Sequence, residues 1–138
     1  MEKTVAIKMG IKPGSRAYFA GSDEAPIAAI SLPDLKILKS LSGKIDYIHL
    51  FAKDQKKMEE WFPKLKKHLA INGMLWVSWP KAKQLGTDLN IKEVIRIGYD
   101  HGLVESTALS INPVWSALKF TYPKAGKEYN NSYGKLPE

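Results

Sequence analysis

Apolar runs of strand length alternate with helical apolar patterns along most of the chain. Residues 45–51 (IDYIHLF) and 74–79 (MLWVSW) are nearly continuous apolar runs, as expected for strands of a parallel sheet that is covered on both faces. Between them, residues 53–69 repeat apolar side chains at steps of three and four, which predicts an amphipathic helix. We expect Pro63 to kink or divide this helix, and we expect Asn72–Gly73 to end it.

The N-terminal part of the chain gives weaker signals. Residues 16–20 (RAYFA) form a short apolar run bounded by glycines, which predicts a strand. A short helix over residues 24–30 follows, with Ser22 or Asp23 as its N-cap. Residues 35–41 (LKILKSL) fit either a helical turn or a strand, and we favour the strand.

The C-terminal part predicts one more helix and a hairpin. Asn90 and Glu93 form a capping-box-like helix start, and apolar residues follow at helical spacing. Residues 103–111 and 114–122 are two strand-like runs joined by Asn112–Pro113, which predicts an antiparallel hairpin.

This order of elements indicates an α/β fold. Strands that alternate with helices predict a Rossmann-like three-layer sandwich, with a mostly parallel sheet that ends in an antiparallel C-terminal hairpin. A length of 138 residues suits one domain. We place a single Rossmann-like domain at residues 1–122 and a polar, flexible tail at residues 123–138.

Composition excludes several classes of protein. The chain has no cysteine, which excludes disulfides, thiol catalysis and thiolate zinc sites. The sequence contains neither an apolar run long enough to span a membrane nor a signal-peptide pattern, so we expect a cytoplasmic protein without a membrane partner.

The net charge of +7 comes almost entirely from lysine, because only Arg16 and Arg96 among the 21 cations are arginine. Arginine supplies the planar fork that reads guanines and grips phosphates, whereas lysine is a hydrated point charge. We therefore do not expect nucleic acid as the main partner, although an electrostatic binder of nucleic acid or acidic proteins stays an alternative.

In an open α/β sheet, ligands bind outside the carboxyl ends of the strands. This rule gives the following candidate ligand-binding residues: Gly21, Ser22, Asp23, Trp79, Pro80, Lys81, Thr87, Asp88 and Trp115. Loop lysines close to a helix N-terminus predict an anion site. Each residue also has a structural interpretation: Thr87 or Asp88 as a helix cap, the lysines as solvated side chains, and Trp115 as a core residue.

Motifs for catalysis and metal binding are missing from the sequence. The three histidines, His49, His68 and His101, match no metal-ligand spacing, and neither G-x-S-x-G nor a Walker A motif occurs. We therefore expect no metal site and assign no catalytic residue. His49 lies in the middle of a predicted strand, either as a core residue or in a polar contact near Asp46.

Several motifs carry a resemblance to known families. They are residues 10–14 (GIKPG), 46–51 (DYIHLF), 75–81 (LWVSWPK), 87–89 (TDL), 102–104 (GLV) and 115–118 (WSAL). With them, the chain resembles an uncharacterised bacterial family of short Rossmann-like proteins, known as a domain of unknown function. The order of elements is also similar to the C-terminal half of class I S-adenosylmethionine-dependent methyltransferases.

The methyltransferase resemblance implies a glycine-rich turn after the first strand and an acid at the end of the second strand. Here the turn carries one glycine, Gly21, and the second strand continues into Leu38–Lys39–Ser40. We therefore expect no cofactor, and a non-catalytic, shortened methyltransferase-like module that binds a small anionic ligand or a protein partner. The alternative is an atypical S-adenosylmethionine-dependent methyltransferase.

Overall fold

A computed structural model describes residues 3–21 and 26–137 of the chain. In chain order its elements are α1 (Val5–Met9), β1 (Arg16–Ala20), the 3₁₀ helix η2 (Ile27–Ile30), β2 (Lys36–Ile37), β3 (Ile45–Phe51), α2 (Gln55–Lys66), β4 (Leu69–Pro80), the 3₁₀ helix η3 (Gln84–Gly86), α3 (Ile91–Asp100), β5 (Val104–Ser110) and β6 (Trp115–Thr121).

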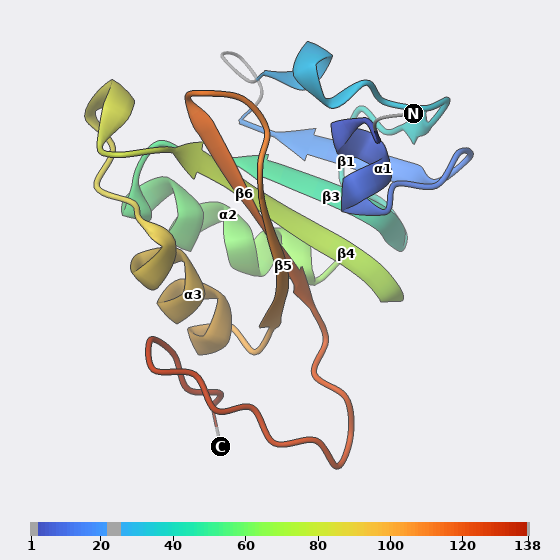
Figure 1. Cartoon of the computed structure of the whole chain (residues 1–138). Coiled ribbons are helices and arrows are strands. Elements are labelled where there is room, and N and C mark those ends of the chain that lie inside the picture. Colours follow the sequence, from blue (N-terminus) through green and yellow to red (C-terminus); the bar gives the residue numbers. More distant parts are fainter. Residues whose placement is uncertain (1–2, 22–25, 138) are drawn as a thin grey trace.

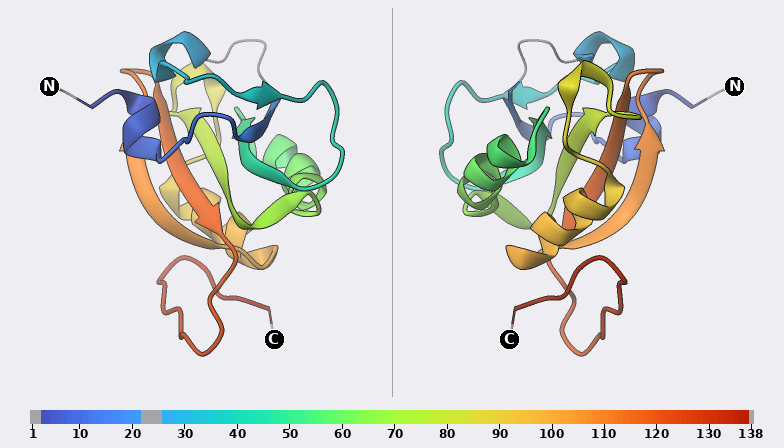
Figure 2. Two further views of the ribbon diagram at one scale, coloured as in Figure 1. Left: turned by 90° about the vertical axis from the view of Figure 1, so that its right-hand side faces the viewer. Right: turned by 90° about the vertical axis from the view of Figure 1, so that its left-hand side faces the viewer.

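One six-stranded sheet runs through the molecule in the order β2-β1-β3-β4-β6-β5 (Figure 1). Strands β2, β1, β3 and β4 are parallel, whereas β6 is antiparallel to β4 and β5 is antiparallel to β6. Helices α2 and α3 cover one face, and α1 with η2 covers the other (Figure 2). This confirms the predicted Rossmann-like three-layer sandwich with its antiparallel C-terminal hairpin.

Two cores, one on each face of the sheet, explain the apolar runs of the central strands. On β3, Ile48 and Leu50 belong to the core under α2 and α3, which we call the first core. Tyr47 and Phe51 belong to the core under α1 and η2, which we call the second core. Side chains of a strand alternate between its faces, so a strand buried on both sides needs an apolar residue at almost every position.

Helix α2 differs from its prediction in length and continuity. It is one helix over Gln55–Lys66 with Pro63 inside it, and it is not divided. Its apolar stripe, Met58, Phe62 and Leu65, is fully buried against the sheet. This burial stabilises the helix against the loss of the single backbone hydrogen bond that proline cannot donate.

The prediction that Asn72–Gly73 ends this helix is wrong. Both residues lie inside β4, where the register with β3 is irregular between Ile45 and Tyr47. A Cβ atom at Gly73 would lie 3.0 Å from the carbonyl oxygens of Ala70 and Asp46. The glycine therefore permits a close backbone approach in an irregular strand, which is another common role for this residue.

The N-terminal elements are shorter than the patterns suggested. The strand predicted within residues 35–41 is present, but it is only the two-residue β2. The helix expected over residues 24–30 is the 3₁₀ helix η2. Its expected caps, Ser22 and Asp23, lie outside the described residues. Sequence reasoning missed helix α1, although Thr4 caps it and Gly10 ends it in the left-handed conformation.

Residues 123–137 contain neither helix nor strand, and they contact the first core. Tyr129 and Leu136 pack against that core, and the Asn131 side-chain amide donates to Glu105 Oε1 at 2.9 Å. Within the described part of the chain, none of the helices is both long and apolar enough to cross a lipid bilayer.

Candidate functional site

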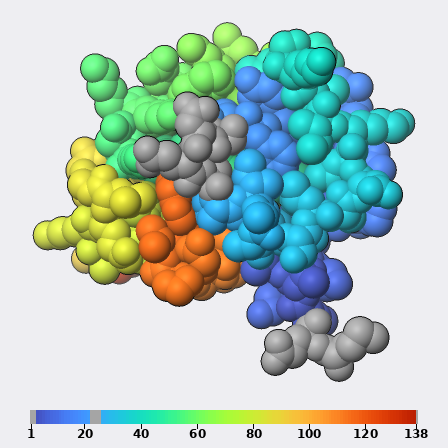
Figure 3. Space-filling view, turned by 90° about the horizontal axis from the view of Figure 1, so that it is seen from above, coloured from blue at the N-terminus to red at the C-terminus, as the bar shows by residue number. Residues whose placement is uncertain are grey.

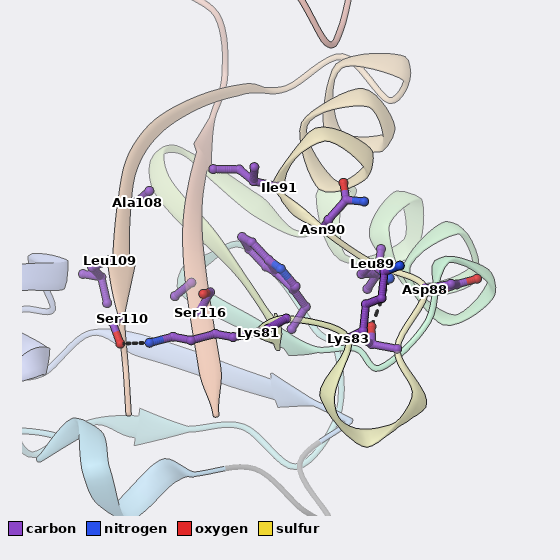
Figure 4. A pocket seen from close by; sticks show the side chains of 14 residues that line it. Lys81, Lys83, Asp88, Leu89, Asn90, Ile91, Ala108, Leu109, Ser110 and Ser116 are labelled. Carbon is purple, nitrogen blue, oxygen red and sulfur yellow. Dashed lines mark hydrogen bonds between the residues drawn. The ribbon is translucent and has the colours of Figure 1, made fainter. Parts of the chain in front are cut away.

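A cavity of about 610 Å³ opens between the carboxyl end of β4, the N-terminus of α3 and the β5–β6 hairpin (Figure 4). The loop that follows β4 lies beside the β5–β6 turn at this end of the molecule (Figure 3). The residues that line the cavity are Trp79, Lys81, Ala82, Lys83, Thr87, Asp88, Leu89, Asn90, Ile91, Ala108, Leu109, Ser110, Ser116 and Ala117. Its volume falls in the range of sites for small organic ligands.

A row of three side chains crosses the sheet at the cavity. Trp79 on β4 pairs directly with Ser116 on β6, and Ser116 pairs with Ser110 on β5. Directly paired residues point to the same face of a sheet, with Cβ atoms about 4.5–5.5 Å apart. Strand pairing therefore brings one aromatic ring and two hydroxyl groups from distant parts of the sequence to one side of the sheet.

Lys81 binds the serine at the end of this row. Its backbone N–H donates to the Val114 carbonyl at 2.7 Å, and its ammonium group donates to Ser110 Oγ. Figure 4 shows the lysine side chain extended across β6 to reach that serine. The result is a cation held beside two hydroxyl groups at one edge of the cavity.

Two polar groups at the cavity have no partner within the described part of the chain. No hydrogen bond involves the Ser116 hydroxyl or the Trp79 indole N–H, although Trp79 is only 5% exposed. Neither atom is among the buried side-chain atoms that lack a partner, so both groups are accessible from the cavity and can donate to a ligand or to water.

Thr87, Asp88 and Asn90 hold the protein's own backbone in place. Asp88 Oδ1 accepts from the Gln55 N–H at 2.8 Å, at the N-terminus of α2, and Figure 4 shows its carboxylate turned away from the cavity. Thr87 Oγ1 accepts from the Leu89 N–H, and Asn90 caps α3 by accepting from the Glu93 N–H. The interpretation of Thr87 or Asp88 as the cap of the following helix is therefore wrong, because Asn90 caps α3, although both side chains do bind backbone N–H groups of the protein.

The loop between Lys81 and Thr87 contains backbone strain. Ala82, Lys83 and Leu85 all have positive φ angles of 49° to 60°, a conformation that is unfavourable for residues with a Cβ atom. The Gln84 side-chain amide donates to the Pro113 carbonyl at 3.4 Å, so contact with the hairpin turn helps to hold the strained loop beside the cavity.

The candidate residues from the sequence fall into three groups. Trp79, Lys81, Thr87 and Asp88 line the cavity, whereas Gly21, Pro80 and Trp115 do not line it, and Ser22 and Asp23 lie outside the described residues. Trp115 pairs with Pro80 and packs in the second core, with its ring centroid 5.9 Å from that of Phe51. Of the two roles left open for Trp115, the structure therefore places its side chain in the core.

Sequence reasoning missed the contribution of the hairpin to the cavity. Ser110 and Ser116 come from strands that were predicted, but Ser110 stands in no motif, and Ser116 was given no role although it lies in the WSAL motif at residues 115–118. The sequence could have indicated these two serines only if β4, β6 and β5 had been paired in the correct register. The reason is that the row of Trp79, Ser116 and Ser110 depends on which residues lie opposite each other.

A separate polar network is buried in the second core. His49 Nδ1 lies 2.6 Å from the Tyr47 hydroxyl, and His49 Nε2 lies 2.6 Å from Ser78 Oγ. His49 is fully buried and stacks on Phe51 with ring centroids 4.1 Å apart. Burial lowers the pKa of His49 to about 3 and raises the pKa of Tyr47.

A neutral imidazole has one donor and one acceptor nitrogen, so it can satisfy both hydroxyl groups. The polar contact of His49 is thus with Tyr47 and Ser78, while the Asp46 carboxylate accepts from the Arg16 N–H. Among the described residues, no three His, Asp or Glu side chains lie close enough together to hold a metal ion.

Comparisons with known proteins identify the fold. No family model matches the chain, and no curated protein matches its sequence. Among solved structures, a ribosomal protein L11 methylase from Lactobacillus delbrueckii subsp. bulgaricus matches with a TM-score of 0.60 at 11% identity, over 87% of this chain and 76% of that one.

Two further methyltransferases are similar. A TehB-like SAM-dependent methyltransferase from Corynebacterium glutamicum gives a TM-score of 0.55 at 11% identity, over 86% of this chain and 85% of its own. The magnesium protoporphyrin IX methyltransferase of Synechocystis PCC 6803 with bound SAM gives a TM-score of 0.58 at 12% identity, over 86% of this chain and 74% of its own. The chain therefore has the Rossmann-like fold of class I S-adenosylmethionine-dependent methyltransferases, within a short sequence.

The described residues do not fit S-adenosylmethionine in the way this fold implies. A Cβ atom at Gly21, which has φ of +69°, would lie 2.2 Å from the Phe51 carbonyl oxygen and 3.1 Å from Lys57 Nζ. Gly21 thus lies close against the end of β3 and beside a lysine of α2, and it is the single glycine at a position where a cofactor-binding turn is rich in glycine. Lys39 follows β2 in place of an acid that would hold ribose hydroxyls.

Proposed function

We propose that this protein is a non-catalytic module of the methyltransferase fold that binds a small anionic ligand in the cavity beside Trp79. One observation carries the proposal: three groups that can donate hydrogen bonds to an anion line the cavity. They are the Lys81 ammonium group, the Trp79 indole N–H and the Ser116 hydroxyl. Asp88, which could repel an anion, is bound to the N-terminus of α2.

The position of the cavity supports the same proposal. It lies outside the carboxyl end of β4, where ligands of open α/β sheets bind, and Gly21 is not among the residues that line it. A ligand could therefore occupy the cavity while Gly21 stays packed against the Phe51 carbonyl group.

A thermal-shift screen with small organic carboxylates, phosphates and sulfonates tests the proposal, followed by calorimetry on each hit. We expect hits to lose affinity at least tenfold in Lys81→Met, because a charged hydrogen bond contributes about 1.5–3 kcal/mol. Lys56→Met is the matched control: it removes the same charge from an exposed position on α2. Hits that bind Lys81→Met as tightly as they bind the wild type would contradict the proposal.

An atypical methyltransferase is the second candidate function. The comparisons favour it more directly than they favour a non-catalytic module, because the similar structures are methyltransferases and one of them holds SAM. The packing of Gly21 on Phe51 is the reason we place it second.

S-adenosylmethionine itself distinguishes the two candidates. A ligand present at 100 times its dissociation constant stabilises a protein by about 2.7 kcal/mol. A clear rise in melting temperature at millimolar S-adenosylmethionine would support the methyltransferase. An unchanged melting temperature, together with binding of another small anion in the cavity, would support the non-catalytic module.

A further inference from the structure

We infer that the ligand of the cavity is an organic monocarboxylate with an apolar body, whose carboxylate is held by Lys81 and Ser116. Ser110 positions Lys81, because its own hydroxyl hydrogen is donated to the Asn112 carbonyl. This inference rests on the proposed function and narrows its ligand class. It is drawn from the placement of the charge, the hydroxyl groups and the apolar walls around the cavity.

The polar groups gather at one edge. Lys81 donates to Ser110 Oγ, and Ser116 is the direct cross-strand neighbour of Ser110. Figure 4 shows these three side chains together on the β5–β6 side, at the lower edge of the cavity in that view. An ammonium group has three donors and uses one of them on Ser110, so two remain for an anion that the Ser116 hydroxyl can also reach.

The other walls of the cavity are largely apolar. Trp79, Leu89, Ile91, Ala108 and Ala117 line it, and Figure 4 places Ile91 and Ala108 on the side away from Lys81. Most of a bound ligand would therefore contact carbon atoms. This arrangement, with apolar walls and a few placed polar groups, is typical of sites for small organic molecules.

The charge around the cavity selects a monoanion. Among the described residues, Lys81, Lys83 and Asp88 are the charged side chains that line it, two cations and one anion, which gives this part of the lining a net charge of +1. No arginine lines the cavity, so the bidentate fork that matches phosphate geometry is missing from its lining. One lysine and one available hydroxyl group, that of Ser116, suit a carboxylate better than a dianionic phosphate monoester.

Three probes that share one apolar body test the inference: 2-naphthoate, 2-naphthamide and 2-naphthyl phosphate. Each is titrated into the full-length ¹⁵N-labelled protein while the indole N–H resonance of Trp79, assigned with Trp79→Phe, is followed. We expect 2-naphthoate to shift this resonance and to bind at least tenfold more tightly than the neutral amide or the phosphate. Lys81→Met should remove the preference for carboxylate over amide, and Lys56→Met should keep it.

The outcomes separate this inference from the proposed function. If the amide or the phosphate shifts the Trp79 resonance at equal or lower concentration than the carboxylate, the cavity binds ligands but the carboxylate inference is wrong. If none of the three probes shifts the resonance at millimolar concentration, both the inference and the proposed function fail. Because Lys81→Met could disturb the hairpin contact, Ser116→Ala provides a second variant, which should weaken 2-naphthoate binding at least threefold.

Discussion

Acidification should destabilise this protein through one residue, His49. The imidazole is fully buried between Tyr47 and Ser78, and burial lowers its pKa from 6.5 to about 3. In the unfolded chain the same ring takes up a proton below about pH 6.5. The unfolded state therefore binds more protons than the folded state between these two values, and stability falls as the pH falls through this window.

The expected magnitude follows from the two pKa values. Each pH unit below 6.5 costs about 1.4 kcal/mol until the pH approaches 3. At pH 4.5, two units below the unfolded value, the loss is about 2.7 kcal/mol. Since a domain of this size has a stability of about 5–15 kcal/mol, this single histidine is expected to contribute a substantial part of its acid sensitivity.

Urea unfolding between pH 7 and pH 4.5 measures the effect in the wild type and in His49→Gln. Glutamine offers one acceptor and one donor group but does not titrate, so the variant should lose about 2.5 kcal/mol less than the wild type over this range. His68→Gln is the matched control, because that partly exposed histidine lies outside the buried network and bonds to the Gly43 carbonyl.

Equal losses of stability in the wild type and His49→Gln would refute the reasoning, since His49 would then titrate alike in the folded and unfolded states. The ¹³C chemical shift of the His49 ring gives an independent check. The ring should stay neutral in the folded protein at pH 4.5, and a protonated ring at that pH would also contradict the argument.

Three further substitutions test the packing around α3 and the loop after β4, each measured by urea unfolding. Gly98→Ala should destabilise by about 1–3 kcal/mol despite the better helix propensity of alanine, because its Cβ would lie 2.0 Å from the Phe120 ring; a stability gain would show that the ring moves freely. Asp88→Ala should cost about 0.5–2 kcal/mol through the lost bond to the Gln55 N–H, whereas Asp88→Asn, which keeps the acceptor, should lose less. Ala82→Gly should raise stability by about 0.5–1 kcal/mol because its φ is 49°; an unchanged or lower value would mean that the loop is not strained.

Local patterns predicted most of the elements. The strands β1 and β3, the start of α3 at Asn90 and the β5–β6 hairpin agree with expectation, because apolar period, caps and turn residues act within a few positions of each other. The errors also lie where local signals are ambiguous. Asn72–Gly73 fits a helix end as well as it fits an irregular strand, and the position of Gly73 against Asp46 could decide between them only in three dimensions.

The candidate site was likewise predicted in part from the sequence, while the rest required the three-dimensional structure. The sequence alone pointed to the carboxyl end of β4 and to Lys81, because the rule for ligand sites in α/β sheets needs only the order of elements. It could not distinguish Ser116, which pairs with Trp79 at the cavity, from Trp115, which points into the opposite core.

What the sequence determined by itself was the order of strands and helices from β1 onward, and with it the methyltransferase-like fold. What only the tertiary structure decided was which side chains meet. Neighbouring residues of a strand point to opposite faces, so a register change of one residue exchanges the whole set of side chains that a face presents. That register placed Ser110 and Ser116 beside Lys81, and it placed Ser78 of β4 beside His49 of β3.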